Sequence, residues 1–167
     1  MSKNYRNGPH NEDYGTPDSL FKPLDREFRF SVDLMASSEN TKCTSYITKE
    51  MNTFKVDWAS YGTCGFCNPP YFQEIIEKVI IRALLFCDLC CFTTVLVLPS
   101  NKTEQLWWHK YIWDNSKNKP YDNIFIRYVI KRVKFIRADG TFSHNTEPTV
   151  IIVITKKRLR SEKDINS

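Results

Sequence analysis

The four consecutive residues Asn68-Pro69-Pro70-Tyr71 are the part of the sequence best suited to chemistry. Two prolines flanked by an Asn and a Tyr are an unusual way to build an ordinary turn after an apolar run. The Asn68 amide oxygen and the Pro69 carbonyl are two acceptors, held in place by the fixed φ angles of the prolines. Together they can accept both hydrogens of an exocyclic NH2 group, which exposes the nitrogen lone pair, while Tyr71 and Phe72 offer a stacking face. The motif therefore predicts a site for a flat aromatic amine that acts as a nucleophile.

The residues around this motif predict a strand before it and a helix after it. The segment 63–67, "TCGFC", is typical of a short buried strand, and residues 73–86 repeat apolar side chains with helical period. In an open α/β sheet, ligands bind beyond the carboxyl ends of the strands, which is where this order places Asn68. A kinked strand-to-helix connection without any chemistry is the simpler interpretation of the tetrapeptide taken alone.

The rest of the chain alternates between patterns typical of strands and of helices. The nearly continuous apolar run at 91–99 is typical of a strand covered on both faces. The predicted strands are 28–36 (ending near Asp33), 43–48, 63–67, 91–99, 124–136 and 148–155. The predicted helices are 18–28 and 73–86, and 103–115 is predicted to be a helix or a helical turn. This order predicts a three-layer α/β domain with a mainly parallel sheet, closed by an antiparallel strand pair.

Length and composition favour one folded domain with a basic surface. The chain has 167 residues, of which 41% are hydrophobic and 14% aromatic, so it can bury a core and is neither disordered nor fibrous. Its net charge of +5 suits a polyanionic partner. No apolar run has the length of a membrane span and the N-terminus lacks an apolar signal region, so we expect an intracellular protein with reduced cysteines. The sequence leaves the oligomeric state open, with a monomer favoured. The predicted domain is 14–155, between a flexible segment at 1–13 and a charged flexible tail at 156–167.

Several segments, taken in order, resemble the phage-type DNA N6-adenine methyltransferases, the small Dam-like enzymes. They are "DYGTPDSLF", "FSVDLMASSENTKC", "YITKEMNTFKVDW", "CNPPYF", "VLPSNKTEQLWWHKYI" and "IKRVKFI", which together span most of the chain. The resemblance implies a shortened Rossmann-like fold that binds S-adenosyl-L-methionine, flips adenine out of double-stranded DNA and methylates its N6 without a metal. The interval between Asp33 and Asn68 is too short for all the strands and helices that larger methyltransferases place there, and the small Dam-like enzymes are shortened in this way.

The resemblance also implies roles for single residues. On the cofactor side, Thr16 and Pro17 correspond to an N-terminal segment beside the methionine end of the cofactor. Asp33, which ends the first predicted strand, corresponds to the acidic residue of the cofactor-binding motif and can pair with the cofactor's amino group. The residues that follow it in this motif are Ala36, Ser37 and Asn40. The residues that correspond to the catalytic motif are Asn68, Pro69, Pro70 and Tyr71.

Two further acidic residues are implied on the cofactor side. Glu50 can accept hydrogen bonds from the ribose hydroxyls, and Asp57 suits the adenine edge of the cofactor, with Trp58 nearby. The loop "DLMASSEN" lacks the glycines of the general methyltransferase loop, so it is a weaker signal on its own. The residues alone leave simpler interpretations open, namely Thr16-Pro17 as a helix start, Glu50 as a solvated surface residue and Trp58 as part of the core.

Four cysteines make a rival case for a zinc site. Cys64, Cys67, Cys87 and Cys90 give the pattern C-x2-C-x19-C-x2-C, which is close to a four-thiolate zinc signature. Residues three apart in a strand face opposite sides, so Cys64 and Cys67 could chelate one ion only from a tight turn. We therefore expect these cysteines to pack in the core, with a zinc-stabilised nucleic-acid-binding module as the alternative.

Two further features have both a functional and a simpler interpretation. His109, in "WWHKYIW", is predicted to be structural rather than a general base, because the extra proton of a methylated nitrogen can leave to water. Basic residues in and after the predicted strand at 124–136 either contact DNA phosphates or form a solvated sheet face. They are Arg127, Lys131, Arg132, Lys134 and Arg137. Because Asn-Pro-Pro-Tyr also serves methyltransferases of RNA bases or of a protein glutamine amide, those activities and an inactive DNA-binding relative stay open as alternatives.

Overall fold

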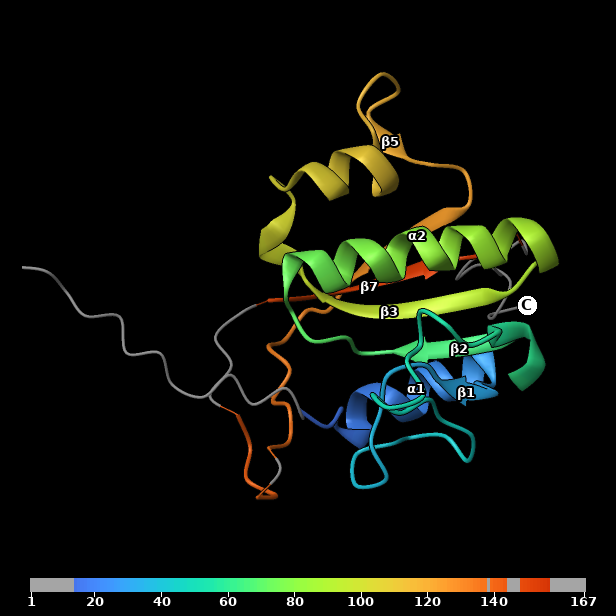
Figure 1. Ribbon diagram of the computed structural model, residues 1–167. Coiled ribbons are helices and arrows are strands. Elements are labelled where there is room, and N and C mark those ends of the chain that lie inside the picture. The colour runs from blue at the N-terminus through green and yellow to red at the C-terminus, as the bar shows by residue number, and fades with distance from the viewer. Residues whose placement is uncertain (1–13, 138, 144–147, 157–167) are drawn as a thin grey trace, which may run out of the picture.

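A five-stranded sheet forms the centre of the protein, with helices on both of its faces (Figure 1). The structure is a computed structural model that describes residues 14–137, 139–143 and 148–156. The strand order along the sheet is β1 (Val32–Asp33), β2 (Cys64–Cys67), β3 (Thr93–Pro99), β7 (Thr149–Ile154) and β6 (Ile124–Tyr128). The other elements are the helices α1 (Asp18–Phe28) and α2 (Gln73–Cys90), the short helices η1 (Trp58–Tyr61), η2 (Ser100–Lys102) and η3 (Trp108–Ile112), and the strands β4 (Trp113–Asp114) and β5 (Lys119–Pro120) of a separate pair.

The central sheet is mainly parallel, as the sequence predicts. Strands β1, β2 and β3 pair in parallel, whereas β7 lies antiparallel between β3 and β6. In the middle of β7, Ile152 pairs with Leu96 on one side and with Ile126 on the other. Only β7 therefore runs against the other strands of this sheet, and β6 and β7 form the antiparallel pair at its edge.

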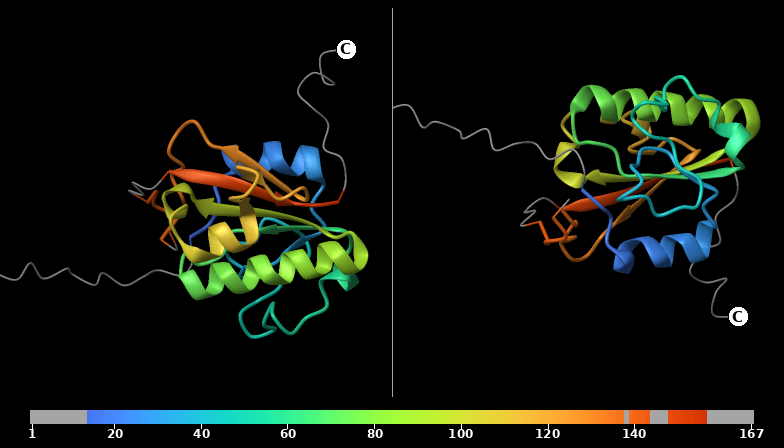
Figure 2. Two further views of the ribbon diagram at one scale, coloured as in Figure 1. Left: turned by 90° about the horizontal axis from the view of Figure 1, so that it is seen from above. Right: turned by 60° about the horizontal axis from the view of Figure 1, so that its bottom comes forward.

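Helices α1 and α2 cover opposite faces of the sheet, as the two views of Figure 2 show. Successive side chains of a strand point to opposite faces, so β3 divides its residues between two cores. Val95 packs with Phe21 of α1, whereas Leu96 packs with Ile80 of α2. Because both faces are covered, β3 and β7 are buried along their whole length. This confirms the predicted three layers.

The connection from β2 to α2 contains the Asn68-Pro69-Pro70-Tyr71 motif. Proline cannot continue a ladder of hydrogen bonds, so β2 ends at Cys67 and the chain turns. The Phe72 N–H donates to the Pro70 carbonyl at 2.8 Å, and α2 then begins at Gln73. The helix is the one predicted at 73–86, but it continues for one more turn to Cys90.

The predicted strand at 43–48 is wrong, because this segment is a loop. It meets β1 only at a single bridge between Asp33 and Tyr46. The Asp33 N–H donates to the Ser45 carbonyl, and the Ile47 N–H donates to the Asp33 carbonyl, both at 2.9 Å. A third bond, from the Ala36 N–H to the Ile47 carbonyl at 3.1 Å, lies beyond the end of β1, which is only two residues long.

Two other predicted elements are shorter than expected. The predicted strand at 124–136 ends at Tyr128, because β7 begins at Thr149 and offers no partner beyond that point. Residues 129–136 instead run along the end of the sheet, where Ile136 and Gly15 exchange two backbone hydrogen bonds of 2.7 and 2.9 Å. Of the helix or helical turn predicted at 103–115, the structure has the short helix η3. The predicted terminal segments, 1–13 and all of 156–167 except residue 156, lie outside the described residues.

Candidate active site

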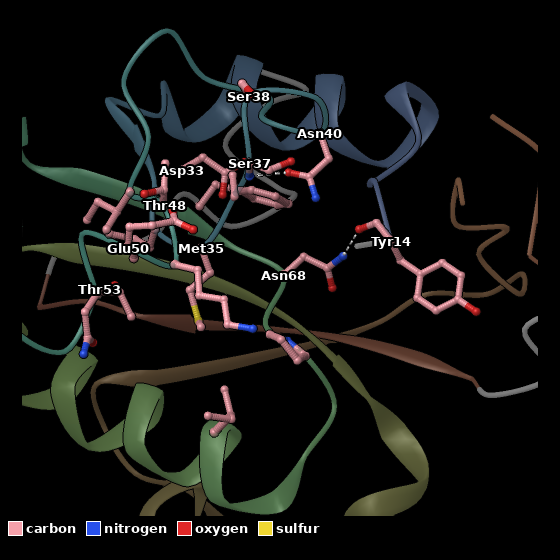
Figure 3. Close-up of a pocket in the computed structure, with 18 of the residues that line it drawn as sticks. Tyr14, Asp33, Met35, Ser37, Ser38, Asn40, Thr48, Glu50, Thr53 and Asn68 are labelled. Carbon is pink, nitrogen blue, oxygen red and sulfur yellow. Dashed lines mark hydrogen bonds between the residues drawn. The ribbon is translucent and has the colours of Figure 1, made fainter. Parts of the chain in front are cut away.

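A cavity of about 630 Å³ lies at the carboxyl ends of β1 and β2. Figure 3 shows Asp33 and Glu50 on one side of this cavity, and Asn68 with Tyr14 on the other. Its walls come from the chain after β1, from the loop at 47–54 and from the turn after β2. Ligands of parallel α/β sheets bind at this edge, and the volume is in the range of small-molecule sites. The cavity is therefore the leading candidate for a ligand-binding site.

Two hydrogen bonds orient the Asn68 amide at the mouth of this cavity. Its Nδ2 donates to the backbone carbonyl of Tyr14 at 3.4 Å, and its Oδ1 accepts from the Tyr71 hydroxyl at 3.3 Å. The amide nitrogen is thereby turned toward the protein's own carbonyl. The Asn68 oxygen has a second lone pair, so it can still accept a hydrogen bond from a ligand.

The other residues of the motif surround this amide. Pro70 lines the cavity, whereas Pro69 is buried and does not line it. Tyr71 is half-buried and also lies outside the lining, with its ring edge-to-face on Phe135 at a centroid distance of 6.3 Å. The structure therefore fixes the Tyr71 ring by packing and its hydroxyl by the bond to Asn68.

Asp33 brings a carboxylate into the wall of the cavity, although its side chain is almost fully buried. The residue is 3% exposed, and its Oδ2 accepts from the Lys42 N–H at 3.2 Å. Burial raises the pKa of Asp33 to about 6, against the lowering effect of the backbone N–H groups of Lys42 and Met35 and of the Lys42 charge. Among the described residues Asp33 forms no ion pair, so a positively charged ligand group would be a favourable neighbour.

Most of the other residues predicted on the cofactor side also line this cavity. Thr16 is buried there, Glu50 is exposed, and the remaining three are Ala36, Ser37 and Asn40. The Ser37 N–H donates to the Asn40 Oδ1 at 2.7 Å, which closes the turn after β1. Pro17 and Asp57 do not line the cavity. Pro17 is the N-cap of α1, and the Asp57 carboxylate accepts from the Ala59 N–H and so caps η1.

Sequence reasoning missed most of the loop that follows Ile47, of which it assigned only Glu50 to the site. Of this loop, the cavity is lined by Thr48, Lys49, Asn52, Thr53 and Phe54, and Tyr14 was missed as well. Loop residues have no periodic pattern. The only signal available was their place between two segments already assigned to the site.

This loop is held against α2 by two large side chains. Trp58 is fully buried, as expected of a core residue, and its Nε1 donates to the carbonyl and to the hydroxyl of Thr53, both at 3.0 Å. The Arg82 guanidinium lies over the rings of Trp58 and Phe86 and donates to the Val56 carbonyl at 2.5 Å. These contacts set the position of one wall of the cavity.

The cysteines are divided between the core and the surface. Cys67 and Cys87 are buried in the core cluster, as predicted, whereas Cys90 is exposed at the end of α2. Burial raises the pKa of the Cys67 and Cys87 thiols, which favours neutral thiols over thiolate ligands. In the described ranges, no group of three or more His, Cys, Asp or Glu residues could hold a metal ion.

The remaining candidates lie outside the cavity. His109 is exposed and its Nδ1 is 3.1 Å from the Asn115 Oδ1. Arg127 forms a bidentate ion pair with Glu27 of α1, at 2.6 and 2.7 Å, so its charge is already matched. Lys131, Arg132 and Lys134 are exposed.

The fold and the cavity define an α/β domain whose candidate site lies at the carboxyl edge of a mainly parallel sheet. The family model for DNA N-6-adenine-methyltransferase (Dam) matches residues 6–167, so the chain belongs to this family. A DNA N-6-adenine-methyltransferase of Haemophilus phage HP1 (strain HP1c1) is 26% identical over 148 residues, which cover 86% of this chain and 79% of the phage protein. The resemblance drawn from the sequence is confirmed. No helix in the described part of the chain has the length and apolarity needed to cross a membrane.

Proposed function

We propose that this protein transfers a methyl group from S-adenosyl-L-methionine to N6 of adenine in double-stranded DNA. Membership of the Dam family supports the reaction. The observation that carries the proposal is the Asn68 amide, oriented by Tyr14 and facing the same cavity as the buried Asp33 carboxylate. An acceptor for an amine and an anion for a cationic cofactor thus share one site.

The residues of the cavity fit the cofactor. The volume of about 630 Å³ suits a ligand of this size. The Asp33 carboxylate would hold the cofactor's ammonium group, with Thr16 and Ser37 beside it, and the exposed Glu50 would accept from the ribose hydroxyls. When bound, S-adenosyl-L-methionine supplies a methyl group on a sulfonium that is an excellent leaving group. We take the domain, with its helices on both sheet faces, as a shortened Rossmann-like methyltransferase fold.

The residues after β2 would act on the adenine. The Asn68 Oδ1 and the Pro69 carbonyl would accept the two N6 hydrogens, so that the nitrogen lone pair is free to form the new N–C bond. Pro70 fixes the turn, and the Tyr71 ring would stack on the flipped base. The extra proton on N6 would leave to water after the transfer, so no general base is needed. The protein's contribution is then mainly positioning and exclusion of water.

Two residues assigned to the cofactor side have less support in this arrangement. Asp57 is proposed at the adenine edge of the cofactor, yet its carboxylate caps η1 and lies outside the cavity lining. Pro17 supports the site only indirectly, as the residue from which α1 begins. For these two residues we expect smaller effects of substitution than for Asp33 and Asn68.

The proposal is tested by incubating plasmid DNA with the full chain and cofactor carrying a labelled methyl group, followed by nucleoside analysis. We expect the label in N6-methyladenine. Label only in 5-methylcytosine would contradict the proposed chemistry. Parallel reactions with RNA and with a protein substrate test the other acceptors of an Asn-Pro-Pro-Tyr site, and transfer confined to either of them would contradict DNA as the substrate.

A further inference from the structure

Ile130 is an apolar side chain that the fold leaves entirely to solvent. It is 99% exposed, although the residues on both sides of it are anchored. On one side, the Val129 N–H donates to the Thr149 carbonyl at 3.1 Å. On the other side, Val133 and Phe135 are buried in the core beneath α1. Ile130 therefore projects from a segment whose two ends are fixed.

This segment leads to the proposed catalytic residues. Phe135 packs edge-to-face on Tyr71. Ile136 is hydrogen-bonded to Gly15, which follows Tyr14, and the Tyr14 carbonyl orients Asn68. Figure 1 shows the segment, in orange, at the end of the sheet where the chain passes from β2 to α2. Five residues of chain span at most about 18 Å, so Ile130 lies no farther than that from Phe135.

The side chains beside Ile130 match the charge of DNA. Lys131, Arg132 and Lys134 are exposed, and among the described residues they form no ion pair. The segment 129–137 contains no Asp or Glu. Basic side chains of this kind bind phosphates and fix the position of a protein on the duplex.

We propose that Ile130 inserts into the base stack of DNA at the place that the flipped adenine leaves. This inference rests on the proposed function. Extruding a base from a duplex costs a few kcal/mol, and apolar side chains inserted between bases are known to stabilise such unstacked steps. A β-branched side chain is suited to this, because its χ1 rotation is restricted and little freedom is lost on insertion. Ile130 is thus a positioning residue that acts on the duplex, with Lys131 and Arg132 on the adjacent phosphates.

The experiment compares Ile130→Ala and Ile130→Leu with wild type on one duplex that contains the methylated sequence. Ile130→Ala removes the inserted side chain and should lower kcat/KM at least tenfold, whereas Ile130→Leu should retain most of the wild-type kcat/KM. A second duplex with the target adenine mispaired should restore most of the Ala variant's rate, because extruding a mispaired base costs less free energy. Leu89→Ala is the matched control, since Leu89 is 72% exposed but lies at the far end of α2. It should behave as wild type.

A second readout follows the base itself. With 2-aminopurine in place of the target adenine, saturating wild-type protein should raise the fluorescence several-fold as the base leaves the stack, and Ile130→Ala should give a smaller rise. Equal rates and equal fluorescence for wild type and Ile130→Ala would overturn the inference while leaving the proposed function intact. Equal impairment of the Ala variant on matched and mispaired duplexes would also overturn it. Failure of the wild type to methylate DNA would instead overturn the proposed function.

Discussion

Asp33 places a carboxylate where water hardly reaches it. A buried carboxyl group is easier to keep neutral than charged, and the pKa of about 6 reflects this. Such an arrangement destabilises the free protein near neutral pH, and a cationic ligand would relieve that penalty. The residue therefore connects the stability of the fold to occupancy of the cavity.

Asp33→Asn should make the ligand-free protein more stable than wild type at pH 7. Because the folded pKa of about 6 lies above the ordinary 3.8, the folded state binds the proton more tightly than the unfolded state. The stability that wild type gains from protonated Asp33 is thus fully present below about pH 4 and is lost as pH rises through about 6. The difference between these two pKa values corresponds to about 3 kcal/mol in the free energy of unfolding. Thermal unfolding of both proteins from pH 4 to 7 measures the difference, and a gap that did not widen with pH would contradict the assignment.

The same substitution should weaken binding of S-adenosyl-L-methionine. Wild-type affinity should rise between pH 5 and 7 as Asp33 ionises, since only the carboxylate pairs with an ammonium group. The Asn variant should bind more weakly at pH 7 and lose this rise. Calorimetric titration at several pH values provides the test. Unchanged affinity at pH 7 would remove Asp33 from the cofactor site.

Tyr71 could act through its ring or through its hydroxyl. If the ring stacks on the flipped adenine, Tyr71→Phe should keep most of the activity, since the ring survives the loss of the hydroxyl and of its 3.3 Å bond to Asn68. Tyr71→Ala should lose about 1–3 kcal/mol, the usual worth of base–aromatic stacking, and regain part of it on a mispaired target. Methylation rates on matched and mispaired duplexes distinguish these effects. A Phe variant as impaired as the Ala variant would make the hydroxyl the working group.

At the scale of elements, the cavity depends on how the loop at 47–57 is fastened to α2. Arg82 contributes a charged hydrogen bond to Val56 and packs on Trp58, which in turn binds Thr53 in the cavity wall. None of these residues contacts the proposed reacting atoms. The loop nevertheless sets the shape of one wall of the cavity, where we propose that the cofactor binds.

Arg82→Met should therefore raise KM for the cofactor more than it lowers kcat. Met keeps much of the packing volume but loses the hydrogen bond from a charged donor, so we also expect a loss of about 1–3 kcal/mol in stability. Lys78→Met, an exposed change one turn earlier on the same helix, is the control and should alter neither quantity. Steady-state kinetics and denaturant unfolding of the two variants check this. Equal effects of both changes would mean that Arg82 does not position the loop.

Elements with strong apolar patterns could be predicted from the sequence. The strands β2, β3 and β7 and the helix α2 are found close to their expected bounds, because burial on one or both faces fixes their side-chain period. The loop at 43–48 was wrongly predicted as a strand, because the extent of its pairing depends on β1, which is only two residues long, and not on the residues of the segment itself. Strand β6 likewise ends at Tyr128 because its partner β7 begins at Thr149, and the residues after Tyr128 give no sign of this.

The position of the candidate site could be predicted where strand ends define it. Asp33 and Asn68 each follow or end a strand, and the parallel pairing of β1 and β2 brings both to one edge. The contact between Asn68 and Tyr14 was not predictable. It is made by the backbone carbonyl of a residue 54 positions away, so the type of side chain at position 14 gives no signal of it. The same holds for the cavity wall at 48–54, whose position depends on Trp58 and Arg82.

At the scale of the whole molecule, the fold has an apolar cluster on each face of the sheet, and we expect it to need no metal. Cys67 and Cys87 belong to one of these clusters, together with Val79, Ile80 and Phe86. Chelators should therefore neither unfold the protein nor reduce its activity. The measurement is metal analysis of the purified protein, with unfolding followed before and after chelation. Stoichiometric zinc whose removal unfolds the protein would contradict this and revive the four-cysteine site.

The central claim is that Asn68 holds the amine that is methylated. Asn68→Ala removes the acceptor without touching Asp33, so methyl transfer to adenine in duplex DNA should be abolished while affinity for S-adenosyl-L-methionine stays near the wild-type value. The direct measurement is the single-turnover rate of N6-methyladenine formation in wild type and variant, together with cofactor binding to both. A variant that retained more than about a tenth of the wild-type rate would have lost less than roughly 1.4 kcal/mol from the barrier, and would contradict the role assigned to Asn68.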